Sequence, residues 1–275
     1  MELILSRSLL FISSKDSVIL YIDLNNEMRF FIMVQKLLNS HASVRKYTDY
    51  TLSKEEVFEL IETAQHAASS HFVQAYSVIW VTDETKKEEL GQLSRNPKQF
   101  ETAGAAFLLC ADFNRLQAAG KLHGTEIEID TTENVLVGTV DVALFAQNLV
   151  IAAESKGFGV CYIGGVRNDP TAISQLFALP EGVFPLFAIT LGVPARQNEV
   201  KPRLPVTAIL HENAYDSSKY EELLKEYDQT MEAYYASRGS NQKVATWTKQ
   251  MADYLENPGR PHMAEFLASK GFHFK

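Results

Sequence analysis

Apolar residues recur at helix or strand spacing along most of the chain, and this pattern predicts its elements. Ser53 and Glu56 form a capping box ahead of apolar residues at helical spacing, which predicts a helix over residues 54–68. A charged helix is expected at 84–93. Short runs of β-forming or apolar residues predict buried strands at 77–82, 105–111, 159–163 and 184–191.

The longest apolar stretch predicts a central helix. Residues 134–156 are apolar on nearly every face and are followed by Gly157, a residue type that commonly ends helices. Asp141, Gln147 and Asn148 interrupt the stretch, which falls short of the roughly 20 uninterrupted apolar residues of a membrane span. We therefore expect a helix buried inside the domain and no membrane partner.

The N-terminal segment, residues 1–32, is the least regular part of the chain. Its short apolar runs follow no register that predicts one partner, and the well-patterned sequence begins at Val34. Two interpretations stay open: the natural start is at Met28 or Met33, or the segment is a loosely ordered arm. We divide the chain into this extension and one domain over residues 33–275.

The C-terminal part, residues 205–275, changes to a helical pattern. Apolar and aromatic residues form one helical stripe, and further helices are predicted around 244–255 and 261–269. The tail can pack on its own domain or embrace a second subunit, and the size of the stripe favours the second. The stripe comprises Tyr220, Leu223, Leu224, Tyr227, Met231, Tyr234 and Tyr235.

Composition and charge narrow the class of protein. The 275 residues are 46% hydrophobic and 22% charged, which is typical of a globular domain with a sizeable core. A net charge of -8 argues against a nucleic-acid partner, so any anion site is local. Cys110 and Cys161 lie in apolar runs and predict no disulfide framework. Charges break the N-terminal apolar stretch, so a cytoplasmic location is expected.

Familiar nucleotide and metal motifs do not fit. The segment from Gly157 to Tyr162 has tyrosine where a dinucleotide fingerprint needs its third glycine, and it precedes a strand instead of following one. No Gly-rich segment ends in Gly-Lys-Ser/Thr. His66 and His71 are five residues apart, which is not the spacing of a zinc-protease helix, and we expect no metal site.

Three short stretches carry candidate chemistry. His41, Ser43 and Arg45 alternate along the chain and suit a phosphate monoester, although a solvated loop explains them too. Residues 162–165 read Tyr-Ile-Gly-Gly, where glycines admit a flat ligand, although a plain strand-to-helix turn accounts for them almost as well. Residues 201–203 read Lys-Pro-Arg, two cations that can neutralise a phosphate or the negative edge of a reduced flavin.

These stretches belong to a series of seven motifs. In their order and spacing the motifs resemble the nitroreductase superfamily, and within it the oxygen-insensitive NADPH nitroreductases and NADPH-flavin oxidoreductases, over residues 34–275. They are HxSxR (41–45), a Ser-rich helix end (Ser69, Ser70, Phe72, Gln74), YIGG (162–165), LGxPA (191–195), KPRLP (201–205), HENxY (211–215) and YYxxRGSN (234–241).

The resemblance implies a fold and an activity. The fold is an α+β sandwich with a central mixed or antiparallel sheet, flanking helices, a long buried central helix and an extended C-terminal helical region. The protein would be a homodimer with FMN at its interface, and would pass electrons from NADPH to nitroaromatics, quinones or free flavin by a ping-pong mechanism without a catalytic acid or base. The alternatives are an NADPH-FMN reductase that supplies reduced flavin and a flavin-binding module without turnover.

The resemblance also implies roles for individual residues. The FMN phosphate and ribityl end would meet His41, Ser43, Arg45 and Arg203. Ser69, Ser70 and Gln74 would line the site from the partner region. Lys201 would lie near the flavin pyrimidine side or the phosphate, and the ring near N5 would lie along Tyr162, Ile163, Gly164 and Gly165. NADPH or substrate would contact Arg238, Ser240, Lys243 and Arg260.

Three positions depart from the family pattern. Ala42 and Lys243 stand where arginine is common, and His71 stands where serine is common. The phosphate cations remain, so FMN binding is still expected. Lys243 lacks the bidentate geometry of arginine, which predicts a looser preference for NADPH over NADH.

Overall fold

The chain divides into two compact units in the computed structural model. Unit 1 comprises Met1–Asn198 and Glu265–Lys275, and unit 2 comprises Glu199–Ala264. The structure describes residues 34–237, 245–257 and 259–274, together with the backbone of three short strands before them.

Unit 1 is built on a four-stranded antiparallel sheet with the order β4-β5-β7-β6. Each strand begins and ends within two residues of its predicted bounds. A mixed or antiparallel sheet was expected, and the sheet is antiparallel. The two central strands are almost completely buried, as continuous apolar runs predict. The strands are β4 (Tyr76–Trp80), β5 (Ala105–Asp112), β6 (Gly159–Ile163) and β7 (Val183–Gly192).

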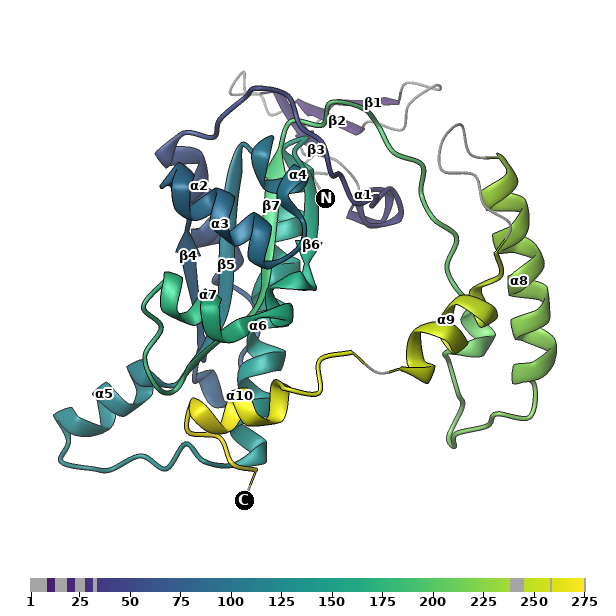
Figure 1. Cartoon of the computed structure of the whole chain (residues 1–275). Helices are drawn as coiled ribbons and strands as arrows, with labels where there is room; N and C mark the ends of the chain where they lie inside the picture. Colours follow the sequence, from purple (N-terminus) through teal and green to yellow (C-terminus); the bar gives the residue numbers. More distant parts are fainter. Residues whose placement is uncertain are drawn as a thin grey trace, which may run out of the picture. The chain divides into compact units, whose positions relative to one another are not determined.

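Helices cover both faces of this sheet (Figure 1). On one face lies α6 with α2 packed against it, and on the other lie α3, α4 and α7. Residues of β5 alternate between the two layers: Leu108 packs with Leu90 and Phe100, whereas Ala111 lies against α6 at Gly138. The helices are α2 (Lys54–Ala64), α3 (Glu84–Leu93), α4 (Pro97–Glu101), α6 (Thr132–Ser155) and α7 (Pro170–Leu176).

The long helix α6 confirms the predicted core helix, but it buries only one of its faces. Phe145 and Leu149 are buried, whereas Leu136, Val140 and Leu144 are 57%, 53% and 41% exposed. Among the described residues it is the one helix long and apolar enough to span a membrane, and its packing on the sheet is that of a core helix. Among the described residues, one apolar face of α6 therefore has no cover.

Local signals set most helix boundaries. Ser53 and Glu56 form the predicted capping box of α2, but this helix ends at Ala64 instead of residue 68. The chain then passes through a turn into the loop after residue 69. Helix α6 ends before Gly157, whose φ of +84° suits glycine.

Several elements lay outside the sequence prediction. The N-terminal apolar runs form an antiparallel meander of β1 (Leu9–Ile12), β2 (Ile19–Ile22) and β3 (Met28–Phe31), so these runs find partners in one another. Helices α4 and α5 were not predicted. The remaining elements of unit 1 are α1 (Val34–Asn39), α5 (Asn114–Leu122), η1 (Ser70–Phe72) and η2 (Gly164–Asn168).

Unit 2 is helical and has a small core. Tyr227, Met231 and Tyr235 lie at helical spacing on α8 and pack with Leu204 and Trp247. Much of the predicted stripe is therefore used inside the unit, and an embrace of a second subunit stays a prediction. The elements are η3 (Val206–Ala208), α8 (Tyr220–Ser237) and α9 (Trp247–Glu256).

The last residues of the chain belong to unit 1. Helix α10 (Met263–Ser269) buries Phe266, and beyond it Phe272 packs edge-on against Phe113 and Phe184. The C-terminal segment thus completes the core at this end of the sheet.

Candidate functional site

Residues 41–47 run beside the sheet and are fastened to it. The Val44 N–H donates to a carbonyl of β6 at 2.8 Å, and the Tyr47 hydroxyl lies 2.8 Å from the Val44 carbonyl and 2.9 Å from a carbonyl of β7. Burial raises the pKa of Tyr47, so the hydroxyl stays protonated. The Ser43 carbonyl accepts a hydrogen bond from Asn198. This backbone is held in place, in contrast to the solvated loop that the sequence also allowed.

Two side chains of this segment carry positive charge or can acquire it. His41 Nδ1 lies 2.6 Å from Glu154 Oε1 on α6. Arg45 is exposed and lies beside the Cys161 thiol: burial raises the pKa of Cys161, and the nearby Arg45 opposes this rise. Glu154 was not predicted, and its signal in the sequence was a single carboxylate near the end of an apolar helix.

Tyr162 is the exposed position of an otherwise buried strand. Its ring is 37% exposed and packs edge-on against Phe187, with 5.3 Å between centroids. Partial burial, together with the charge of Glu154, raises the pKa of Tyr162 to about 12. The next residue, Ile163, is buried in the core, so only its backbone can face a ligand. Tyr162, His41 and Arg45 therefore gather around the outer edge of β6.

The two glycines after β6 have different reasons to be glycine. A Cβ on Gly165 would lie 2.0 Å from the Ser94 carbonyl oxygen, so packing against the end of α3 requires its absence. A Cβ on Gly164 would meet only the flexible end of Arg167, at 3.2 Å. Close packing in a strand-to-helix turn thus accounts for Gly165, and approach to a ligand stays a prediction for Gly164.

A buried carboxylate organises the loop before β4. Asp141 on α6 is 1% exposed and accepts hydrogen bonds from the Ser69 hydroxyl (2.7 Å), the Ser70 N–H (3.2 Å) and the Ala75 N–H (3.0 Å). The Ser69 oxygen in turn accepts from the Gln74 N–H at 2.8 Å. Three predicted site residues are therefore tied to one residue that the prediction did not include.

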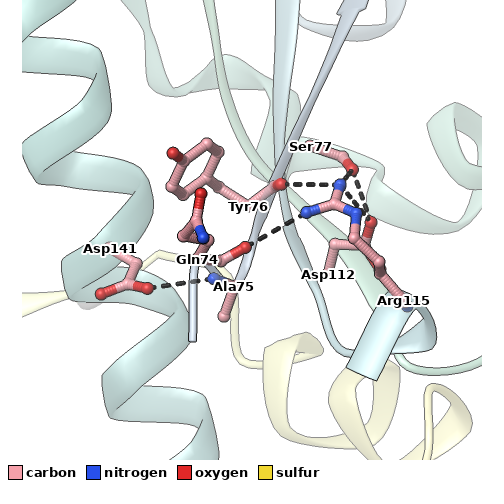
Figure 2. Close-up of polar contacts among 7 residues, drawn as sticks. All are labelled: Gln74, Ala75, Tyr76, Ser77, Asp112, Arg115 and Asp141. Carbon is pink, nitrogen blue, oxygen red and sulfur yellow. Dashed lines mark hydrogen bonds and ion pairs between the residues drawn. The ribbon is translucent and has the colours of Figure 1, made fainter. Parts of the chain in front are cut away.

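A second network holds the same loop from the other side (Figure 2). Arg115 on α5 donates to the carbonyls of Gln74 and Tyr76 at 3.2 and 3.1 Å and to the Ser77 hydroxyl at 2.7 Å. The Asp112 carboxylate lies 3.2 Å from the same guanidinium and orients it. Neither Arg115 nor Asp112 was predicted from sequence.

The loop between these networks has an unusual backbone. His71, Phe72 and Gln74 have φ values of 46°, 60° and 51°, in the left-handed region that favours glycine. Each such residue costs on the order of 1–3 kcal/mol and persists only where surrounding contacts enforce it. The hydrogen bonds of Asp141 and Arg115 supply that enforcement.

The sheet order separates the two groups of candidates in unit 1. The loop with Gln74 precedes β4 at one edge, whereas Tyr162 lies on β6 at the other edge. Three spacings between adjacent strands correspond to roughly 14 Å. Single-chain geometry therefore does not bring Gln74 and Tyr162 into contact.

Two candidates of unit 2, Lys201 and Arg203, lie near α8. Lys201 Nζ lies 5.6 Å from the centroid of the Tyr235 ring, and both Lys201 and Arg203 are exposed. The charge of Arg203 opposes the rise in the pKa of Tyr227 that burial causes. Arg260 has a left-handed φ of 68°. Three predicted NADPH residues, Arg238, Ser240 and Lys243, lie outside the described residues.

The sequence and the fold of this chain are similar to those of known proteins. The Nitroreductase family profile matches residues 38–193, and its C-terminal domain profile matches residues 201–275. A Cr(VI) reductase from Pseudomonas sp. (strain G-1) is 66% identical over 243 residues, 88% of this chain and 100% of that protein. An NADPH-flavin oxidoreductase from Vibrio harveyi is 40% identical over 235 residues, 84% of this chain and 95% of that protein. A solved nitroreductase from B. subtilis superposes with a TM-score of 0.84 at 37% identity, covering 88% of this chain and 99% of that one.

Proposed function

Because the chain belongs to the nitroreductase family, we propose that it binds FMN, takes electrons from NADPH and passes them to flat, electron-poor acceptors. Membership makes the protein an NAD(P)H-dependent flavin oxidoreductase. The proposal concerns the flavin, the nucleotide and the acceptors. Nitroaromatics, quinones and free flavin are the acceptors we propose, and supply of reduced FMN to another protein is the alternative use of the same reaction.

The observation that carries the FMN assignment is the cluster at the outer edge of β6. It combines an exposed cation, Arg45, an imidazole hydrogen-bonded to a carboxylate, His41, and a partly exposed aromatic ring, Tyr162. FMN has the matching parts, namely a phosphate that suits cations and a flat ring that suits an aromatic neighbour. The donor set of unit 1 therefore fits this cofactor.

The chain's own residues would bind and orient. Bound FMN supplies the group that accepts and then donates a hydride. Arg45 would hold the phosphate, Gln74 would direct its amide to the ring, and Tyr162 would cover part of the ring against water. Assignment of Lys201 and Arg203 to the same cofactor stays a prediction from the family resemblance. If nucleotide and acceptor react with the flavin in turn, the kinetics should be ping-pong.

Chromate is an additional acceptor that we propose. The support is the relative at 66% identity, which is named for Cr(VI) reduction. Chromate is a small dianion and differs from flat aromatic acceptors in shape and charge. If the cation Arg45 at the proposed site attracts chromate, the kcat/KM for chromate should fall more steeply with ionic strength than that for a neutral nitroaromatic.

The first test is the visible spectrum of the purified protein without oxygen, before and after one equivalent of NADPH or NADH. Oxidised flavin bands that disappear faster with NADPH would support cofactor and nucleotide together. A colourless protein that takes up no added FMN would overturn the proposal. Comparing kcat/KM for a nitrofuran, a quinone, free FMN and chromate then ranks the acceptors.

We also propose a homodimer in which the flavin site is shared. Two observations support it: Gln74 and Tyr162 lie at opposite edges of the sheet, and the exposed face of α6 presents Leu136, Val140 and Leu144. An apolar stripe of this kind is typical of a protein interface. One flavin can then meet the β6 edge of one protomer and the Gln74 loop of its partner.

Light scattering after size-exclusion chromatography tests this assembly. Val140→Glu should lower the dimer fraction and FMN retention together, because the charge would be buried in the interface. Leu122→Glu is the matched control, since Leu122 on α5 is 85% exposed and lies away from the α6 stripe in sequence. Val140→Glu with an unchanged dimer would show that α6 is not the interface.

A further inference from the structure

The backbone on both sides of the Gln74 α-carbon is held by hydrogen bonds. The Ala75 N–H on its C-terminal side donates to Asp141, and the Gln74 carbonyl accepts from Arg115 (Figure 2). On the N-terminal side, the Gln74 N–H donates to the Ser69 oxygen, which is itself bonded to Asp141. The peptide group after Gln74 is therefore fixed by long-range partners, and the one before it is fixed by Ser69, which Asp141 holds.

The side chain of Gln74 has no comparable partner. Its amide makes no hydrogen bond with any residue that the structure describes, although the residue is half-buried. The left-handed φ of 51° sets the direction in which this side chain leaves the backbone. A strained backbone that ends in an unpaired amide is typical of a residue held ready for a ligand.

A carboxylate at position 141 suits this loop because the hydrogen-bond partners of Asp141 among the described residues are all donors. Two donors, the Ser69 hydroxyl and the Ala75 N–H, reach one carboxylate oxygen, and the Ser70 N–H reaches the other. An asparagine of the same size would face at least one of these donors with its own N–H₂ group. Asp141→Asn should thus release the loop with little change in volume.

We propose that Asp141 and Arg115 are positioning residues for flavin binding, which hold Gln74 in the left-handed conformation so that its amide meets the flavin. This inference rests on the proposed function. Asp141 acts through the N–H groups around Gln74, and Arg115 acts through the Gln74 carbonyl. Neither residue touches the flavin itself.

The main test is a double-mutant cycle that measures the FMN dissociation constant of the full-length protein. Asp141→Asn should raise the constant about tenfold in the natural background and less than about twofold in a Gln74→Ala background. If Asp141→Asn raised the FMN dissociation constant by the same factor in both backgrounds, the inference would be overturned. Arg115→Lys retains the charge but not the fork, and should raise the constant less than Arg115→Ala does.

Asp130→Asn is the matched control. Asp130 is a mostly buried carboxylate of unit 1 that accepts from the backbone and ring of His273, so its loss should lower thermal stability. The FMN dissociation constant of Asp130→Asn should equal that of the natural protein. If a general loss of stability caused weak flavin binding, Asp130→Asn and Asp141→Asn would raise this constant equally.

A second experiment measures the thermal stability of flavin-free variants. Glycine adopts a positive φ at no steric cost, so Gln74→Gly should melt at a higher temperature than Gln74→Ala in the flavin-free protein. In an Asp141→Asn background this advantage should disappear, and its persistence would overturn the role of Asp141. If the natural protein takes up no FMN, the proposed function fails, whereas this arm still decides whether Asp141 enforces the backbone.

Discussion

Unit 1 and unit 2 differ in how much apolar surface they enclose. In unit 1 both faces of the sheet are covered, and residues such as Phe107 and Leu108 are fully buried. In the described part of unit 2, the buried apolar residues are Tyr227, Met231 and Tyr235, on one stripe of α8. Because apolar burial is the dominant source of stability, unit 1 has a core of its own and unit 2 depends on one helix face.

This difference separates two kinds of candidate site residue. In unit 1 His41 pairs with Glu154 on α6, and Ser69 and Ala75, which flank the Gln74 loop, bond to Asp141 on the same helix, so this geometry is set before any ligand arrives. In unit 2 Lys201 and Arg203 are exposed cations beside a small core. Segments with little buried surface open most easily, and many ligand-binding elements are of this kind.

The largest expected effect compares the two cores. Leu108→Ala should lower the free energy of unfolding by about 2–5 kcal/mol, because Leu108 is fully buried between sheet and helices. Met231→Ala should instead reduce hydrogen-exchange protection in α8 and α9 and leave the main thermal transition in place. If both variants lowered the midpoint temperature of the main thermal transition equally, the division into a strong and a weak core would be contradicted.

The next effect separates flavin binding from nucleotide binding. Arg45→Ala should raise the FMN dissociation constant about 10- to 100-fold, the range expected for loss of a charged hydrogen bond. Arg238→Ala should raise KM for NADPH about tenfold and leave FMN bound. Flavin release by Arg238→Ala, measured from the absorbance of the filtrate, would overturn this separation.

A smaller effect concerns nucleotide preference. Lys243→Arg should raise the ratio of kcat/KM for NADPH over NADH about fivefold, because arginine binds a phosphate through two parallel hydrogen bonds. Lys249→Arg is the control in the same unit, since Lys249 already pairs with Asp253 on α9. Equal ratios in both variants would remove Lys243 from the nucleotide site.

The smallest effect is expected at the N-terminus. Strands β1, β2 and β3 pair with one another, so removing residues 1–32 should leave flavin content, kcat and the proposed dimer unchanged. Flavin absorbance and light scattering check this. A large loss of folded dimer would show that the meander is part of the stable assembly.

Elements with strong local signals were predictable from sequence. The capping box of α2 gave the observed start of that helix, and the continuous apolar runs of β5 and β6 gave boundaries close to those observed. The end of α2 was not predictable, because residues after Ala64 form a turn that leads into a loop bonded to Asp141. That partner lies 72 residues from Ser69 in sequence and leaves no local pattern.

The candidate site divides in the same way. Motif order pointed to His41, Arg45, Gln74 and Tyr162, but gave no indication of what holds them. Glu154, 113 residues from His41, was recognisable only as a lone carboxylate in an apolar helix.

The sequence by itself determined the four strands of the main sheet, its central helix and the family resemblance, because these depend on periodicity and on short motifs. Asp141 shows what it left undecided: in the sequence it is a charge that interrupts an apolar stretch. Only the tertiary structure decided that this carboxylate gathers three donors from a loop 66 to 72 residues away. Burial makes such a charge stable only where donors surround it, and those donors meet it only when the chain has folded.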